Sequence, residues 1–239
     1  MSPTTRLFCI VSGAILLGCS TGTLYVPDED PELIAATIMA DEYRGRRDAV
    51  LVIEDAERRR AYPNIENFLD GPNPALSLYR EPLTRDRVVD FFVEQAGSEA
   101  IALPILYYAD RLNISLTLVY GLVWGESRFY PVAVNRNATS IDRGLFQLNS
   151  LTFRHLTEDD FFNIDVNTYH GLKYLRFCLD MGDSDAQALA IYNAGLTRVI
   201  RGQTPASTLR YVDGVLTYQA RLRTLFREYI LSHFPPTIA

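Results

Sequence analysis

The sequence predicts a mainly helical protein. Apolar residues recur with the 3.6-residue period of an amphipathic helix over most of the chain, and no stretch shows a strand-like alternation of comparable strength. The composition is that of a globular protein, with 48% hydrophobic and 22% charged residues in a chain of 239. A chain of this size can bury one sizeable core and carry an appendage. We therefore expect a helical domain preceded by a smaller N-terminal part.

The first residues have the layout of a secretory signal. Arg6 precedes an apolar run that ends at Gly18 and is too short to span a bilayer. The run closes with Leu16-Leu17-Gly18-Cys19, which resembles the lipobox of bacterial lipoproteins. That resemblance implies a signal peptide at 1–18 and a lipid anchor on Cys19. Each methylene of the attached acyl chains that is buried in the membrane contributes about 0.8 kcal/mol to membrane binding. A plain signal peptide cut nearby and an N-terminal core helix are the alternatives.

The predicted anchor places the protein in the cell envelope, on the periplasmic face of a bacterial membrane. Ser20 after the cysteine is compatible with the outer membrane where one exists. The chain carries a net charge of −6, and removal of the signal makes it more acidic, so nucleic acid is a poor partner. With Cys9 in the signal and Cys19 lipidated, Cys178 alone remains, so no disulfide forms within one mature chain. Cys178 lies in an apolar helical stretch and indicates a buried small hydrophobe.

The N-terminal part begins with a short polar tether. Asp30 followed by Pro31 is a good helix start, and a first helix is expected to about Arg44, with a second over 46–62. Residues 62–83 hold several prolines and a glycine and indicate a linker or an irregular strap. We place a boundary near residue 82, which gives a tether and helical segment at 19–82 and a main domain at 83–239.

The main domain is expected to contain a series of helices. Breaks at Gly97-Ser98 and at 113–115 divide residues 84–127 into three helices, with Ser98 and Ser115 as N-caps. Three later segments carry the same period, and 142–149 could form a short extended piece bounded by turns. These later helices are predicted at 167–182, 184–195 and 205–231.

The sequence gives no indication of a metal or a cofactor. The three histidines, His155, His170 and His233, do not have the spacing of metal ligands. No HExxH or CxxC motif and no phosphate-cradling glycine loop is present. We therefore expect chemistry that depends on side chains alone.

Glu126 is the strongest candidate for a reactive group. It follows the apolar run LTLVYGLVWG and should lie at the end of a buried helix, where desolvation would raise its pKa. A carboxyl that stays protonated near neutral pH can donate to a leaving-group oxygen, as glycoside cleavage requires. A solvated helix residue is the alternative for a lone glutamate.

Four motifs in order resemble known families. Glu126-Ser127 and the turn from Gly144 to Gln147 resemble the lysozyme-like superfamily, whose fold is α+β. Further on, ALAIYNAG and TPASTLRYV resemble blocks of the soluble lytic transglycosylase family. The resemblance covers about residues 98–222 and implies a mainly helical, lysozyme-like catalytic domain with a substrate cleft.

The resemblance also implies roles for single residues. Glu126 would be catalytic, Gly144 would let the backbone approach a sugar, and Gln147 would offer amide donors and an acceptor to it. Tyr192 would present its hydroxyl to Glu126, while Tyr211 would line the cleft or pack in the core. Asn135 stands where many relatives have serine. The implied substrate-binding residues are Ser127, Asn135, Gln147, Tyr192, Asn193 and Tyr211.

A second resemblance concerns Asp142. The segment NRNATSIDRGLFQLNS is also similar to animal-type lysozymes, in which an aspartate at this place is the second catalytic carboxylate of a retaining hydrolase. Those lysozymes depend on several disulfides, which one mature thiol cannot form, and they lack the Tyr-Asn-Ala-Gly block. We therefore expect Asp142 to be a turn residue that supports the loop, with a second carboxylate as the alternative.

Together these features predict a lipid-anchored lytic transglycosylase that acts on peptidoglycan glycan strands without a cofactor. It would cleave the β-1,4 bond from N-acetylmuramic acid to N-acetylglucosamine and leave 1,6-anhydro ends, with Glu126 as its single acid and base. A muramidase hydrolase that uses Glu126 and Asp142 is one alternative. A non-catalytic glycan-binding envelope lipoprotein is the other.

Overall fold

The computed structural model describes residue 42, which lies in a helix, and residues 65–235. The predicted signal peptide, Cys19, the tether and nearly all of the helices expected at 31–44 and 46–62 lie outside the described residues. The account that follows therefore concerns residues 65–235.

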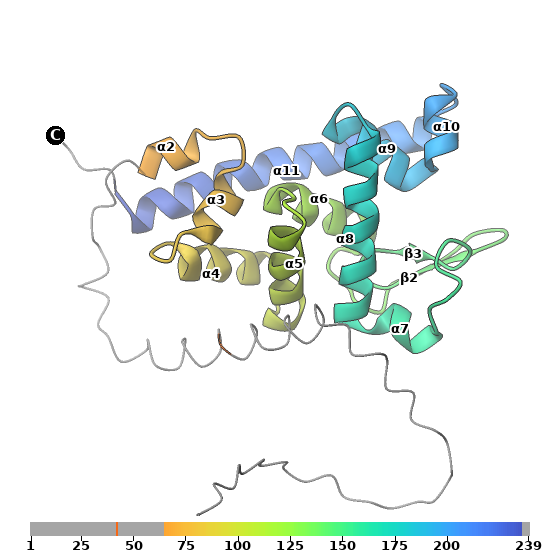
Figure 1. The fold of residues 1–239 in the computed structure, drawn as a ribbon, viewed down its shortest axis with the longest axis horizontal. Coiled ribbons are helices and arrows are strands. Elements are labelled where there is room, and N and C mark those ends of the chain that lie inside the picture. The colour runs from red at the N-terminus through yellow and green to blue at the C-terminus, as the bar shows by residue number, and fades with distance from the viewer. Residues whose placement is uncertain (1–41, 43–64, 236–239) are drawn as a thin grey trace, which may run out of the picture. The chain divides into compact units, whose positions relative to one another are not determined.

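The described part is mainly helical, as the sequence predicts, and carries one small antiparallel sheet (Figure 1). This combination is consistent with a lysozyme-like fold. The helices are α2 (Ile65–Leu69), α3 (Pro74–Arg80), α4 (Arg85–Ala96), α5 (Glu99–Arg111), α6 (Leu116–Ser127), α7 (Glu158–Phe162), α8 (Ile164–Met181), α9 (Asp185–Ala194), α10 (Leu196–Ile200) and α11 (Ala206–His233). The strands are β1 (Val134–Arg136), β2 (Ile141–Arg143) and β3 (Leu148–Asn149).

The helices expected from the apolar period are confirmed. Helices α4, α5 and α6 are separated at the two predicted breaks, and α8, α9 and α11 match the later segments within a few residues. Ser98 and Ser115 occupy N-cap positions, but neither side chain makes a capping hydrogen bond. Ser184 at α9 does so, since its hydroxyl accepts from the backbone N–H of Gln187 at 3.2 Å.

Within the described part of the linker or strap expected at 62–83, two short helices are present, α2 and α3. Pro74 stands in the first turn of α3, where its missing N–H costs nothing. Ile65 of α2 and Leu76 and Leu78 of α3 are at most 1% exposed and join the same hydrophobic core as α4, α5 and α6. Residues 65–80 therefore pack as part of the helical domain. The separate segment proposed for 19–82 stays a prediction.

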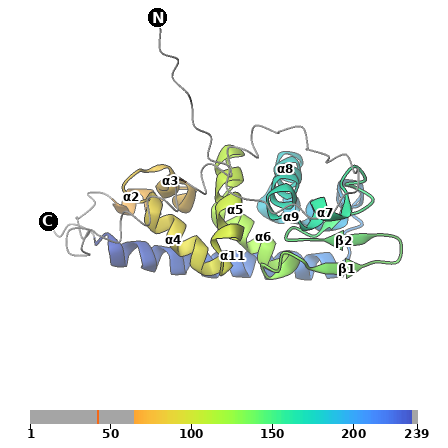
Figure 2. The same ribbon diagram turned by 90° about the horizontal axis from the view of Figure 1, so that it is seen from below.

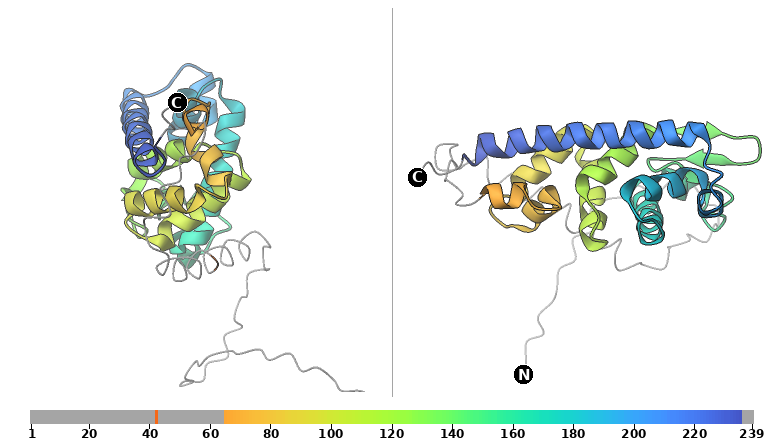
Figure 3. Two further views of the ribbon diagram at one scale, coloured as in Figure 1. Left: turned by 90° about the vertical axis from the view of Figure 1, so that its left-hand side faces the viewer. Right: turned by 90° about the horizontal axis from the view of Figure 1, so that it is seen from above.

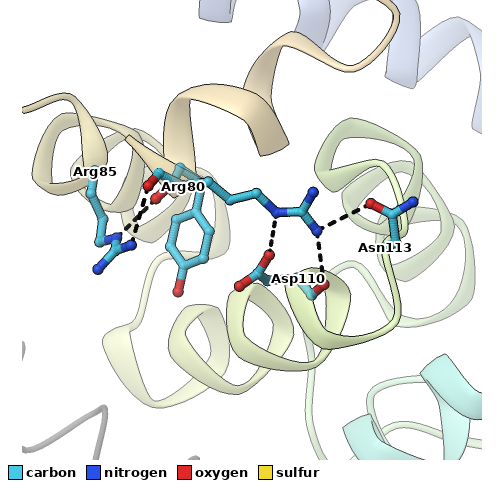
Figure 4. A network of polar contacts seen from close by, with 5 residues as sticks. Arg80, Arg85, Asp110 and Asn113 are labelled. Atoms are coloured by element: carbon cyan, nitrogen blue, oxygen red, sulfur yellow. Dashed lines mark hydrogen bonds and ion pairs between the residues drawn. The ribbon is translucent and has the colours of Figure 1, made fainter. Parts of the chain in front are cut away.

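A polar network fastens the end of α3 to the end of α5 (Figure 4). Arg80 Nε donates to Asp110 Oδ1 at 2.6 Å, and its Nη2 donates to the Asp110 carbonyl and to Asn113 Oδ1, both at 3.1 Å. Arg85 Nε donates to the Tyr79 carbonyl at 2.9 Å. The side chains of Arg80 and Asp110 are 46% and 34% exposed, so this ion pair contributes about 1 kcal/mol at most.

The sheet is a three-stranded meander with the order β1-β2-β3. Asn135 of β1 pairs with Asp142 of β2, which in turn pairs with Asn149 of β3. The expected extended piece at 142–149 thus supplies β2 and β3, with a turn between them. Strand β1 is a feature that the sequence did not predict, because its three residues are all exposed and show no alternation.

Helix α11 is the longest helix of the described part and runs beside most of the other elements, as Figures 2 and 3 show. It packs antiparallel to α6, since Arg223 lies by Thr117 whereas Tyr211 lies by Gly125. Its C-terminal half reaches α2, where Arg227 Nη1 contacts Asp70 Oδ1 at 2.8 Å. One helix therefore links α2 to the last turn of α6.

Cys178 of α8 is a free thiol with no exposed surface, which confirms the buried small hydrophobe expected there.

Within residues 65–235 no helix combines the length and the hydropathy needed to cross a bilayer.

Candidate active site

Glu126 lies in the last turn of α6, at the end of a helix that is buried on nearly every side. Leu122 and Val123 in the preceding turn have no exposed surface, and Glu126 itself is half-buried. Burial raises the pKa of Glu126 to about 8, against 4.5 for a free side chain. The negative charge of Asp142 adds to the increase, whereas a hydrogen bond from Tyr211 lowers this pKa. The carboxyl is therefore mostly protonated at neutral pH.

Tyr211 of α11 is the hydrogen-bond partner of this carboxyl, since its hydroxyl donates to Glu126 Oε1. Burial raises the pKa of Tyr211 well above its usual value, and the charge of Glu126 raises it further. The phenol consequently stays a donor over the whole range in which Glu126 titrates. The expectation that Tyr211 lines a cleft or packs in the core missed this direct bond.

Tyr192 does not make the bond that the resemblance implies. Its hydroxyl donates to the Phe146 carbonyl at 2.9 Å, so the expected contact with the Glu126 carboxyl is wrong. Burial raises the pKa of Tyr192 well above its usual value, and the negative charge of Glu126 raises it further. The Tyr192 side chain therefore lies near Glu126, although it does not bond to it. Tyr192 thus ties α9 to the backbone of the segment that carries Gln147.

Gln147 uses its amide group inside the protein. Its Nε2 donates to the carbonyls of Ala133 at 3.1 Å and Gly144 at 2.9 Å, which occupies both hydrogens. The contact of Gln147 with a sugar stays a prediction, and both of its amide hydrogens are used within the protein. Within the described residues its Oε1 accepts no hydrogen bond, and its backbone has a φ of +48°, in the left-handed region.

Gly144 is needed for packing within the protein. Its φ is +79°, and a Cβ at this position would lie 2.2 Å from the Phe161 carbonyl and 2.3 Å from Asn167 Nδ2. The glycine is buried under α7 and α8, so the expected close approach of a sugar to this backbone is not what it provides. Asn167 fixes the same turn, since it accepts from Phe146 N–H at 2.8 Å and donates to the Phe161 carbonyl at 2.9 Å.

Asp142 lies in a strand and not in a turn. It sits in the middle of the sheet, where its carboxylate accepts hydrogen bonds from three asparagine side chains. The Nδ2 atoms of Asn137 and Asn149 donate at 2.7 Å, and that of Asn135 donates at 3.4 Å. The expectation that it supports the loop is confirmed, although the turn position is wrong. Asp142 holds the three strands together through these amides.

The other predicted residues are engaged with the protein. Ser127 is 8% exposed and its hydroxyl donates to the Val123 carbonyl of its own helix at 3.3 Å, which does not favour the predicted sugar contact. Asn193 Oδ1 accepts from the Thr208 hydroxyl at 2.7 Å and so joins α9 to α11. Asn135 is exposed on β1, beside Asp142.

Trp124, Arg128 and Tyr218, which form a group next to Glu126, had no role in the sequence-based prediction. The Arg128 guanidinium lies 3.6 Å from the centroid of the Trp124 ring, and Trp124 stacks on Tyr218 at 4.6 Å. Arg128 and Phe129 both have a positive φ, of 55° and 61°. Backbone strain of this kind concentrates at functional sites. Nothing in the letters Ser-Arg-Phe signals such a conformation.

The described residues contain no group of His, Cys, Asp and Glu that could hold a metal ion. A surface cavity of about 330 Å³ lies elsewhere, where the start of α6 meets the end of α8 and the start of α9. None of the predicted site residues lines it. A substrate cleft at Glu126 stays a prediction.

The comparisons with known proteins give one family. Residues 104–210 match the family model described as the Transglycosylase SLT domain. The matched segment runs from α5 into α11 and includes Glu126, Gln147 and Tyr192, and it ends one residue before Tyr211. A search of curated proteins found no match.

Proposed function

We propose that the protein is a lytic transglycosylase that cleaves peptidoglycan glycan strands, with Glu126 as its acid and base. The observation that carries this proposal is a carboxyl whose pKa of about 8 keeps it protonated at neutral pH, within the segment that matches the Transglycosylase SLT domain. A neutral carboxyl can act as a general acid, a role that typically contributes a 10²–10⁴-fold acceleration. The substrate class follows from the family match.

In the first step the Glu126 carboxyl donates its proton to the oxygen that links N-acetylmuramic acid to N-acetylglucosamine. The bond from that oxygen to the anomeric carbon breaks, and the carbonyl oxygen of the N-acetyl group on the muramic acid stabilises the carbon. This step requires no second protein carboxylate. A step without Asp142 is compatible with the structure, because the Asp142 carboxylate already accepts hydrogen bonds from three asparagine side chains.

In the second step the ionised Glu126 accepts the proton of the 6-hydroxyl of the muramic acid. The oxygen attacks the anomeric carbon and closes the 1,6-anhydro ring, which regenerates the protonated acid. The Tyr211 hydroxyl donates to the carboxylate during this step and stabilises its charge. The internal hydroxyl competes well with water, because well-oriented intramolecular groups reach effective molarities of about 10⁵ M or more.

The proposed location is the cell envelope, where peptidoglycan lies. The Leu16-Leu17-Gly18-Cys19 sequence supports a lipid anchor at Cys19, with a membrane as the partner of that anchor. Ser20 supports the outer membrane where one exists.

The test is digestion of purified sacculi by the wild-type protein and by Glu126→Gln, followed by mass spectrometry of the fragments before and after borohydride reduction. We expect 1,6-anhydro ends, which borohydride leaves unchanged, and a loss of at least about 10³-fold in the variant. Reducing ends would instead assign a hydrolase that uses Glu126 and Asp142. A well-folded wild-type protein without lytic activity would favour the non-catalytic glycan-binding protein.

A further inference from the structure

The contact between α6 and α11 leaves no room for a side chain at the turn that carries Glu126. A Cβ added at Gly125 would lie 2.8 Å from Val215 Cγ2 and 3.3 Å from Tyr211 Cε2. One turn earlier, a Cβ at Gly121 would lie 3.0 Å from the Val215 carbonyl oxygen. Real Cβ atoms essentially never approach other atoms closer than 3.0 Å. The two helices can meet in this way only because α6 has no side chain at these points.

Glycine is costly in the interior of a helix, so its presence there calls for a local reason. Gly214 on α11 serves as an internal comparison, because a Cβ at that position would meet no atom within 4 Å. The restriction at Gly125 therefore comes from the α6 and α11 contact and not from helical glycines in general.

The Tyr211 ring reaches Glu126 through this contact. Tyr211 and Val215 are four residues apart on α11, so they lie on one face, and both lie within 3.3 Å of the position that a Cβ of residue 125 would take. Tyr211 Cε2 is bonded to the carbon that bears the hydroxyl. A side chain at 125 would thus push on the edge of the ring beside the group that donates to Glu126 Oε1.

We propose that Gly125 is a positioning residue, whose missing side chain sets the separation of α6 and α11 at which the Tyr211 hydroxyl reaches the Glu126 carboxyl. The catalytic consequence of this contact rests on the proposed function, but the contact itself does not. Gly125 affects the Glu126 carboxyl only indirectly, through the position of the Tyr211 side chain.

The proposal predicts the direction of a measurable change. Burial raises the pKa of Glu126 to about 8, and the hydrogen bond from Tyr211 lowers it. If the Tyr211 ring is displaced, the hydrogen bond weakens and the pKa of Glu126 rises above about 8. The loss of a hydrogen bond of ordinary strength corresponds to an upward shift of about half a unit or more. A loss of folded protein alone would lower the activity without moving any pKa.

The experiment is a ¹³C NMR titration of the Glu126 carboxyl, assigned by its absence in Glu126→Gln, in five proteins. These are the wild type, Gly125→Ala, Tyr211→Phe, the control Gly214→Ala, and Gly125→Ala combined with Val215→Ala. We expect Gly125→Ala to raise the pKa, but by less than Tyr211→Phe does, because the added Cβ displaces the ring while Tyr211→Phe removes the hydroxyl. The double variant, which removes the Val215 contact, should raise it less, and Gly214→Ala should leave it unchanged.

A folded Gly125→Ala that titrates like the wild type while Tyr211→Phe shifts would overturn the inference. If Gly125→Ala does not fold, the double variant decides, because its Cβ at 125 still lies 3.3 Å from Tyr211 Cε2 and should leave a smaller rise. A pKa of the double variant equal to or below that of the wild type would then overturn the inference. The titration requires no activity. A shift in a protein that cleaves no sacculus would therefore leave this inference standing and reject the proposed function, whereas a lytic protein without the shift would do the reverse.

Discussion

At the scale of single residues, the pKa of Glu126 reflects two opposed effects. Burial at the end of α6 disfavours the carboxylate, and the Tyr211 hydroxyl favours it, with burial the larger effect. The result is an acid that is protonated near neutral pH yet has a donor ready to stabilise its ionised form. That balance suits a group that must first give a proton and then take one back.

Asp142 provides a prediction at this scale. Asp142→Asn replaces an acceptor of three amide donors by a side chain with only one acceptor oxygen, so the sheet should loosen. Because the proposed mechanism needs no second carboxylate, we expect less than about a 100-fold loss of lytic activity, against at least about 10³-fold for Glu126→Gln. The fragments should keep their 1,6-anhydro ends. An equal loss in both variants, measured on sacculi at one pH, would instead support the two-carboxylate hydrolase.

The sequence predicted the buried position of Glu126 but not the residue that forms a hydrogen bond with its carboxyl. An apolar run before Glu126 suffices to predict a buried helix end, because that information is local. The partner of the carboxyl is not local, since Tyr192 and Tyr211 both lie on helices and only the close contact of α6 with α11 brings the second tyrosine to Glu126. The Gly121-x-x-x-Gly125 spacing was the one available signal of that contact.

At the scale of elements, the turn between β2 and β3 depends on packing under α7 and α8. Gly144→Ala would place a methyl group 2.2 Å from the Phe161 carbonyl at a φ of +79°. We expect destabilisation by about 3 kcal/mol or more, from steric overlap together with backbone strain. Gly202→Ala is the matched control, because its φ is +67° in open space. It should cost only about 1 kcal/mol. Urea unfolding measures both, and similar values would show that overlap at Gly144 is relieved without cost.

The elements that the sequence missed are short. Helices α2, α7 and α10 have five residues each, and β1 has three, which is too few for a period of 3.6 or 2 to become visible. Longer helices such as α8 and α11 were predicted because their apolar stripes extend over several turns. The prolines at 62–83 suggested a linker, but Pro74 in fact begins a helix.

At the scale of the whole described domain, α11 connects the site to the rest of the core. It carries Tyr211 near its start, packs Val215 and Gln219 against α6, and contacts Asp70 through Arg227 near its end. Displacement of this one helix would therefore reach both the acid and the core. Stability and the proposed activity thus depend on the same contact.

The raised pKa of Glu126 has a consequence for stability against pH. Its pKa is about 8 in the folded protein and near 4.5 when free, so the folded state holds the proton more tightly. The stability from this group is fully present below pH 4.5 and is lost as the pH rises to 8. Because Glu126 is only half-buried, solvent reduces the energetic effect of this pKa shift. We therefore expect the free energy of unfolding of Glu126→Gln to rise by about 2–3 kcal/mol relative to that of the wild type between pH 4 and pH 9. Urea unfolding of both proteins across this range measures the difference, and parallel curves would contradict it.

The most direct test of the central claim is the ¹³C NMR titration of Glu126 in the wild-type protein. The account predicts that its carboxyl titrates with a pKa of about 8 and thus remains largely protonated at pH 7. A pKa near the ordinary value of 4.5 would contradict it, because the side chain would then be ionised at neutral pH and could not serve as the proton donor.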